Sequence, residues 1–251
     1  MATAVRDGAR IEYQVTGDGP PLVLLHGFFG DRSTWHAAGH VDALADRFRL
    51  ILVDLAGHGG SDAPRDPARY RMSAHAGDVA AVLDSLGVDR AAVWGASMGG
   101  RVGFHLIARF PGRVTALVAG GAHAGVIEVD PAELERETAL LREQGTAPFA
   151  DAMEPGWMRR VVLRADGHAL AAQALADAAD QGPPPELDAA PVPVLLLAGE
   201  HDPRLSLIRA TGGRLRRAEV AVLPGCGHFD TFTRTDLTIP LVREFLGRPR
   251  P

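Results

Sequence analysis

Short apolar runs alternate with longer amphipathic segments along most of the chain. Residues 10–15 alternate apolar and polar positions, as half-buried strands do, whereas residues 22–25 and 50–53 are continuously apolar. Continuous apolar runs are typical of parallel strands that helices cover on both faces. The same patterns predict further strands at 91–94, 114–119, 194–198 and 220–223, and helices at 35–46, 74–86, 98–110 and 237–245. This alternation predicts a doubly wound, mostly parallel α/β sheet.

The pattern changes after residue 120. Between residues 122 and 180 the periodicity is helical, and no strand is predicted. Helices are predicted at 131–144, 149–153, 157–164 and 168–179. The run from Gly182 to Pro185 then forms a stiff linker before strand patterns return. We therefore expect a core of residues 1–120 and 188–251, with a helical cap (lid) of residues 121–187 inserted after the sixth strand.

Composition narrows the class of protein. The chain has 251 residues, of which 46% are hydrophobic and 23% charged, as in ordinary globular domains. A net charge of −5 gives no general attraction to nucleic acid or to anionic membranes. No apolar stretch approaches the roughly 18 residues of a membrane span, and the first residues lack the apolar core of a signal peptide. We expect a cytoplasmic protein, monomeric or dimeric, that acts on a small molecule.

Several residue types are absent or rare. All 26 basic residues are arginine, so chemistry that depends on lysine, such as Schiff-base formation, is excluded. Cys226 is the single cysteine, which excludes an internal disulfide and a cysteine-rich zinc site. We expect Cys226 to be a small buried residue rather than a nucleophile. No metal or organic cofactor is expected.

A serine motif lies between a predicted strand and a predicted helix. Gly95, Ser97 and Gly99 form the pattern G-x-S-x-G, which places a serine nucleophile at a sharp strand-to-helix turn. Such a serine needs a base and an orienting acid. His228 follows the predicted strand 220–223, and Asp202 follows 194–198. The other candidates are His26, His58, His123 and His201 for the base and Glu200 for the acid.

With the order Ser97, Asp202, His228, the chain resembles the α/β-hydrolase family over nearly its whole length. Residues 26–30 (HGFFG) resemble the loop after the family's third strand, and residues 54–61 (DLAGHGGS) resemble the loop after its fourth. The resemblance implies a catalytic triad. It also implies an oxyanion hole made by the backbone N–H groups of Phe28 and Met98.

Substrate contacts are expected from the loops near the triad and from the cap. The candidates for substrate binding are His26, Phe29, Arg101, His123, Met153, Trp157 and Phe229. Arg101 follows Ser97 by four residues and shares its helix face. The segment from Ser97 to Arg101 is similar to the menaquinone-pathway lyase of this fold, in which the matching arginine holds a substrate carboxylate. That enzyme carries tyrosine before the serine, where this chain has Ala96.

The resemblance favours a serine hydrolase of the carboxylic ester hydrolase kind, acting on a small ester, lactone or thioester. A serine at position 97 argues against the haloalkane dehalogenases and epoxide hydrolases of this fold, which use aspartate. The epoxide hydrolases also use cap tyrosines, and Tyr13 and Tyr70 both precede the cap. Three alternatives remain: a carbon–carbon bond hydrolase, a lyase of the menaquinone-pathway kind, and a ligand-binding member with low turnover.

Overall fold

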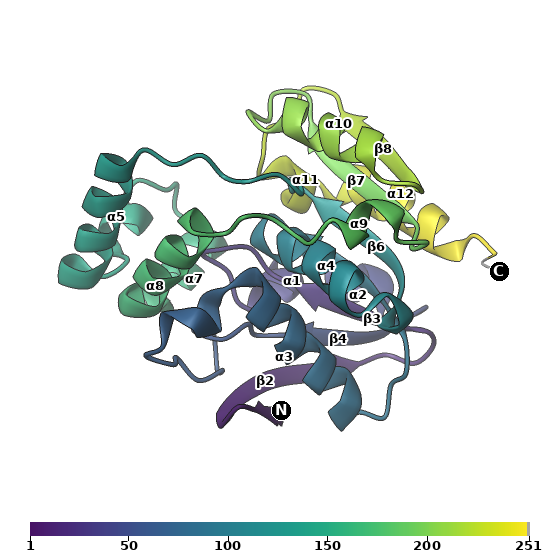
Figure 1. Ribbon diagram of the computed structural model, residues 1–251, viewed down its shortest axis with the longest axis horizontal. Helices are drawn as coiled ribbons and strands as arrows, with labels where there is room; N and C mark the ends of the chain where they lie inside the picture. Colours follow the sequence, from purple (N-terminus) through teal and green to yellow (C-terminus); the bar gives the residue numbers. More distant parts are fainter. Residues whose placement is uncertain (250–251) are drawn as a thin grey trace.

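In a computed structural model, which describes residues 1–249, eight strands form one sheet (Figure 1). The strand order is β1-β2-β4-β3-β5-β6-β7-β8. Strands β1 and β2 pair antiparallel, β2 also pairs antiparallel with β4, and all other pairs are parallel. The strands are β1 Ala2–Arg6, β2 Ala9–Thr16, β3 Pro21–Leu25, β4 Arg49–Val53, β5 Ala91–Ala96, β6 Val114–Gly120, β7 Val194–Gly199 and β8 Ala218–Leu223. The predicted doubly wound, mostly parallel sheet is confirmed.

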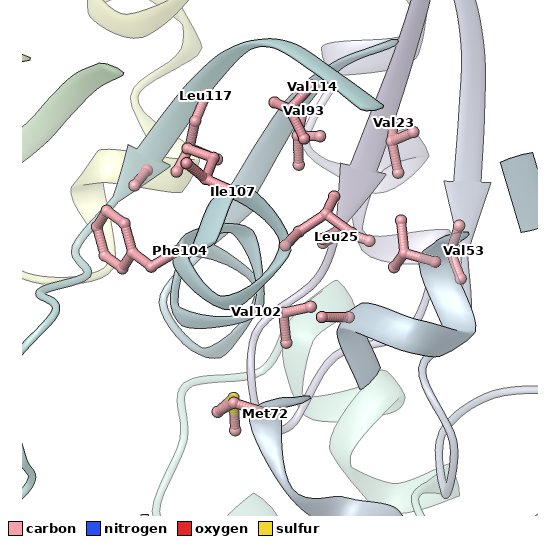
Figure 2. Packing of buried hydrophobic residues seen from close by; sticks show 14 of the residues in the cluster. Val23, Leu25, Val53, Met72, Val93, Val102, Phe104, Ile107, Val114 and Leu117 are labelled. Atoms are coloured by element: carbon pink, nitrogen blue, oxygen red, sulfur yellow. The ribbon is translucent and has the colours of Figure 1, made fainter. Parts of the chain in front are cut away.

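Alternate strand residues build a core on each face of the sheet. Val23 and Leu25 of β3 belong to one buried cluster, part of which Figure 2 shows, with Met72, Val102 and Phe104 from the helices on that side. Helices α3 Met72–Ser85, α4 Met98–Arg109, α9 Glu186–Ala189 and α10 Leu205–Arg214 contribute to this face. Side chains of successive strand residues point to opposite faces, so two helical layers shield the continuous apolar strands.

The neighbouring residues of β3, Leu22 and Leu24, belong to the cluster on the other face, with Trp35 and Trp94. The helices that contribute to it are α1 Ser33–Ala37, α2 His40–Leu44, α11 Asp230–Thr233 and α12 Thr235–Gly247. The helix predicted at 35–46 is two short helices, because Gly39 adopts a φ of 83° between them. Strand β1 and helices α9, α10 and α11 were not predicted, since short or weakly periodic segments give no distinct pattern.

The predicted cap helices follow β6 and precede β7 in the sequence, and in space they lie together at one end of the sheet (Figure 1). They are α5 Pro131–Gln144, α6 Ala147–Asp151, α7 Trp157–Arg164 and α8 Gly167–Ala178. Hydrogen bonds fix α8 to the core: Gln173 Nε2 donates to Tyr70 O (2.9 Å), and its Oε1 is 2.7 Å from His75 Nε2. The expected boundary at residue 187 falls inside α9, which packs against α4. The assignment of residues 121–187 to a cap stays a prediction.

None of the helices in residues 1–249 is both long enough and apolar enough to cross a membrane.

Candidate active site

Ser97 occupies a strained turn between β5 and α4. Its backbone has φ 48° and ψ −110°, a left-handed region that residues with side chains rarely adopt. Strain of this kind costs about 1–3 kcal/mol and persists only where the surrounding structure enforces it. Here the Ser97 N–H donates to Gly120 O on β6 (2.7 Å). The turn holds the serine beyond the end of β5, at the floor of a cavity.

The two glycines of the motif allow the start of α4 to approach the ends of two strands closely, β5 at Gly95 and β3 at Gly99. A Cβ on Gly95 would lie 2.2 Å from the backbone carbon of Gly99, and a Cβ on Gly99 would lie 2.3 Å from Leu25 O. Backbone atoms cannot yield as a flexible side chain can, so neither position accepts alanine without displacement of the turn. The pattern G-x-S-x-G therefore has a steric cause in this fold.

Gly95→Ala is expected to lower the free energy of unfolding by at least about 2 kcal/mol, as overpacking against backbone does. The measurement is thermal unfolding of the variant beside the parent protein. Gly213→Ala, in α10, is the matched control, because its added Cβ would meet nothing within 4 Å. The control should be neutral or slightly stabilising, since alanine favours helix. Equal stability of Gly95→Ala and the parent would contradict the steric argument.

Ser97, His228 and Asp202 form a continuous hydrogen-bonded series. His228 Nε2 lies 3.1 Å from Ser97 Oγ, and its Nδ1 lies 2.8 Å from Asp202 Oδ2. The Asp202 side chain is fully buried, and its second oxygen accepts from the backbone N–H of Arg204 (2.9 Å). Gly121, at φ 62°, leaves room for the imidazole, because a Cβ there would lie 2.8 Å from His228 Cε1. The structure thus brings together the three residues that the sequence singled out as nucleophile, acid and base.

The rival acid Glu200 and the rival bases His58 and His201 do not line the cavity that contains Ser97. Glu200 is exposed, and its Oε2 accepts from Gly225 N–H (2.8 Å). His201 is exposed, whereas His58 is buried with its Nε2 at 2.8 Å from Phe28 O. Cys226, two residues before His228, is buried and has a free thiol.

Two backbone N–H groups are free at the cavity wall. Neither Phe28 N–H nor Met98 N–H donates a hydrogen bond to another group within residues 1–249. Met98 is the first residue of α4, where N–H groups have no partner inside the helix. The bond between His58 Nε2 and Phe28 O fixes the orientation of the loop that carries the other N–H. Both residues line the cavity beside Ser97, and an oxyanion hole made by their N–H groups stays a prediction.

A cavity of about 460 Å³ opens onto Ser97 between the loops of the sheet and helices α5, α7 and α8, a size that suits a small-molecule ligand. Of the residues expected to bind substrate, Phe29, Arg101, His123 and Phe229 line it. Phe229 is also 61% exposed, so it lies at the rim of the cavity. The other residues that line the cavity include Ile127, Val129, Leu134, Glu137, Met158, Ala174, Asp177, Arg204, Thr231 and Phe232.

Three of the expected substrate contacts do not line this cavity. His26 is fully buried: its Nε2 accepts from Leu55 N–H (3.1 Å) and its Nδ1 lies 2.9 Å from Gly27 O, so the ring fixes two loops to each other. Trp157 packs against Phe232 with ring centroids 6.3 Å apart, on the side of the second core cluster. Met153, which follows α6, also does not line the cavity. The methionine that lines it is Met158 of α7.

Arg101 is held in an ion pair with the segment that follows the cap helices. Its Nη2 lies 2.6 Å from Asp180 Oδ2, and its side chain is 7% exposed. Arg101 Nη1 is buried and has no hydrogen-bond partner among residues 1–249. The charge of Arg101 is therefore already balanced by a carboxylate of the chain itself.

Asp177 of α8 lies in the same wall. Burial raises the pKa of Asp177 to about 6, although the nearby Arg101 charge acts in the opposite direction. Its Oδ1 accepts from Gln173 Nε2 (3.0 Å). Burial also lowers the pKa of His123 to about 4, and the charges of Arg101 and Arg204 add to this effect. His123 is consequently neutral at physiological pH.

Asp177→Asn is expected to stabilise the protein at about pH 8 by roughly 1–2 kcal/mol. The folded-state pKa of Asp177 lies above its ordinary value, so the folded protein favours the neutral carboxyl. That contribution is complete below about pH 4 and is lost as the pH rises through about 6. Asparagine keeps the acceptor for Gln173 without the charge. Thermal unfolding between about pH 4 and 8 measures the difference, and it should shrink towards the acid end.

The exposed Asp89→Asn is the control for a change of net charge alone. If both variants are stabilised equally, or if the stabilisation by Asp177→Asn does not change with pH, then the burial of the charged Asp177 carboxylate does not destabilise the protein.

Three charged residues that line the cavity were not predicted from the sequence: Glu137, Asp177 and Arg204. Arg204 follows the acid by two residues, which was an available signal. The direction of a side chain on a loop is not encoded in periodicity, however, so the signal did not separate it from surface arginines. No cluster of metal-binding side chains is present in residues 1–249.

Comparisons with known proteins agree with this architecture. Residues 20–165 match the family described as alpha/beta hydrolase fold, and the chain belongs to that family. It is an enzyme of the α/β-hydrolase kind.

Two solved structures are similar over almost the whole chain. One is the enol-lactonase from Burkholderia xenovorans LB400, with 27% identity, a TM-score of 0.87 and coverage of 98% of this chain and 100% of the other. The second is a thermophilic esterase from Thermogutta terrifontis, with 26% identity, a TM-score of 0.85 and coverage of 98% and 97%. A curated Bacillus subtilis (strain 168) protein is 29% identical over 96% of both chains. It carries the provisional name 2-succinyl-6-hydroxy-2,4-cyclohexadiene-1-carboxylate synthase.

Proposed function

We propose that this enzyme hydrolyses a small ester, lactone or thioester through an acyl-enzyme on Ser97. The observation that carries the proposal is the hydrogen-bonded series from Ser97 Oγ through His228 to Asp202, which opens onto the cavity. The similarity to an esterase and to an enol-lactonase supports the same reading.

Each residue has a defined role in the proposed reaction. Ser97 Oγ attacks the carbonyl carbon while His228 Nε2 takes the hydroxyl proton. Asp202 holds the Nδ1–H of His228 and stabilises the imidazolium that forms. The N–H groups of Phe28 and Met98 bind the oxyanion of the tetrahedral intermediate. His228 then protonates the leaving oxygen or sulfur. In the second half-reaction it takes a proton from the water molecule that attacks the acyl carbon, and it returns this proton to Ser97 Oγ as the acid is released.

The alternatives differ in the bond that is broken. A carbon–carbon bond hydrolase would act on a diketone from ring cleavage with the same triad. A lyase of the menaquinone-pathway kind would use Arg101 to hold a substrate carboxylate. The ion pair between Arg101 and Asp180 makes that use less favourable, because Asp180 already balances the charge of Arg101. A ligand-binding member would retain its ligand with little turnover.

The test is a rate comparison on p-nitrophenyl butyrate, a six-membered lactone, a simple thioester and a vinylogous diketone. Saturable hydrolysis of the ester or lactone supports the proposal. If the enzyme turned over only the diketone, the function would be carbon–carbon bond hydrolysis and not ester hydrolysis. Slow release of a tightly bound ligand, without turnover of any of the four, would favour a binding protein.

A further inference from the structure

Arg204 lies where the triad meets the cavity. Its backbone N–H donates to Asp202 Oδ1 (2.9 Å), which anchors its main chain to the triad acid. Its guanidinium Nη1 lies 3.1 Å from His228 Nδ1, and the side chain lines the cavity. The Arg204 guanidinium therefore contacts one nitrogen of the His228 ring, and the other ring nitrogen, Nε2, faces Ser97.

Arg204 is the cavity cation that lacks a balancing carboxylate. It forms no ion pair with any carboxylate in the part of the chain that the structure describes, whereas Arg101 is paired with Asp180. His123 adds no charge at neutral pH, because burial lowers its pKa to about 4. The carboxyl groups of Glu137 and Asp177 come from the cap helices, and burial raises the pKa of both. A half-buried, unpaired guanidinium in a cavity favours an anionic ligand.

The contact between Arg204 and His228 conflicts with catalysis. In the working tautomer Nδ1 carries a proton and donates it to Asp202, so Nδ1 has no lone pair for a second donor. If Nδ1 instead accepts from Arg204, the proton resides on Nε2, which then cannot take the proton of Ser97. An acceptor within the cavity that draws the guanidinium away from Nδ1 would remove this competition.

We propose that Arg204 binds a carboxylate of the substrate, so that the enzyme acts on esters or lactones that carry a free carboxylate a few carbons from the scissile carbonyl. This inference rests on the proposed hydrolase function. Two effects combine: the carboxylate gains charge-assisted, bidentate hydrogen bonds from the guanidinium, and His228 Nδ1 is left to Asp202 alone. Arg204 is in this account a specificity residue, and it takes no part in bond breaking.

The test compares two methyl esters that differ in charge at one end. Monomethyl glutarate carries a carboxylate, and methyl isoheptanoate has an isopropyl group of similar shape in its place. For the parent enzyme, kcat/KM should be higher on the glutarate ester. In Arg204→Met the ratio of the two kcat/KM values should fall by about tenfold to a hundredfold, mainly through the KM of the glutarate ester. Arg204→Lys should restore part of the ratio.

Free glutarate provides a readout that does not depend on turnover of the charged ester. It should inhibit hydrolysis of methyl isoheptanoate competitively, with an inhibition constant that rises by a similar factor in Arg204→Met. Arg209→Met, at an exposed position of α10, the helix that follows Arg204, is the control for a lost surface charge and should leave both quantities unchanged. Thermal unfolding verifies that each variant is folded.

The outcomes separate the two proposals. If the parent enzyme hydrolyses both esters without preference, or if Arg204→Met lowers both kcat/KM values equally, the assignment of Arg204 is overturned while the hydrolase function stands. If the folded parent enzyme hydrolyses neither ester nor any p-nitrophenyl ester, the hydrolase function fails, and the inference fails with it.

Discussion

Ser97→Ala is expected to lower kcat for ester hydrolysis by about a millionfold, the effect of removing the nucleophile in other serine hydrolases with a triad. Alanine removes Oγ, the atom that lies 3.1 Å from His228 Nε2, and leaves the turn otherwise intact. The residual rate would come from the oxyanion hole and from substrate binding. The measurement is the initial rate on p-nitrophenyl butyrate at saturating substrate.

Ser206→Ala is the matched control, because Ser206 is exposed on α10. It should retain the parent rate. If Ser97→Ala keeps more than a small percentage of the parent kcat while Ser206→Ala is normal, Ser97 is not the nucleophile.

Asp202→Asn is expected to lower kcat by about 10⁴-fold, with a smaller effect on KM. An asparagine that turns its NH₂ towards Nδ1 favours the tautomer with the proton on Nε2, which cannot act as the base. Glu200→Gln is the matched control, because Glu200 precedes Asp202 by two residues, is exposed, and accepts from the exposed Gly225 N–H. The measurement is kcat and KM for both variants on the same ester.

The roles of the two acids would be reversed if Glu200→Gln were the inactive variant. Equal and modest losses in both variants would contradict a triad that depends on the buried carboxylate of Asp202.

The triad residues could be predicted from sequence because backbone architecture places them. Gly95 and Gly99 mark a turn that no other residue fits, and Asp202 and His228 each follow a recognisable strand. In a parallel sheet the carboxyl ends of neighbouring strands lie at one edge, so residues after β5, β7 and β8 converge there. The sheet and the cap helices were predictable for the same reason, since both depend on periodicity.

The cavity wall could not be predicted with the same success, because it depends on where individual side chains point. Trp157 and Met158 are neighbours on α7, about 100° apart around the helix axis, and only Met158 reaches the cavity. His26 lies in the correct loop, but hydrogen bonds with Leu55 and Gly27 fix its ring away from the substrate side. Arg204 can be recognised as a residue of the site only from the structure, which shows its guanidinium close to His228.

The most direct test of the account is covalent labelling with a fluorophosphonate, followed by mass spectrometry. An activated serine displaces the fluoride and forms a stable phosphonate ester that resembles the tetrahedral intermediate. The account predicts one adduct per chain, on the peptide that contains Ser97, and none in Ser97→Ala or in the unfolded protein. An adduct on another residue such as Cys226, or a folded enzyme that remains unlabelled, would contradict the assignment of Ser97 as the nucleophile.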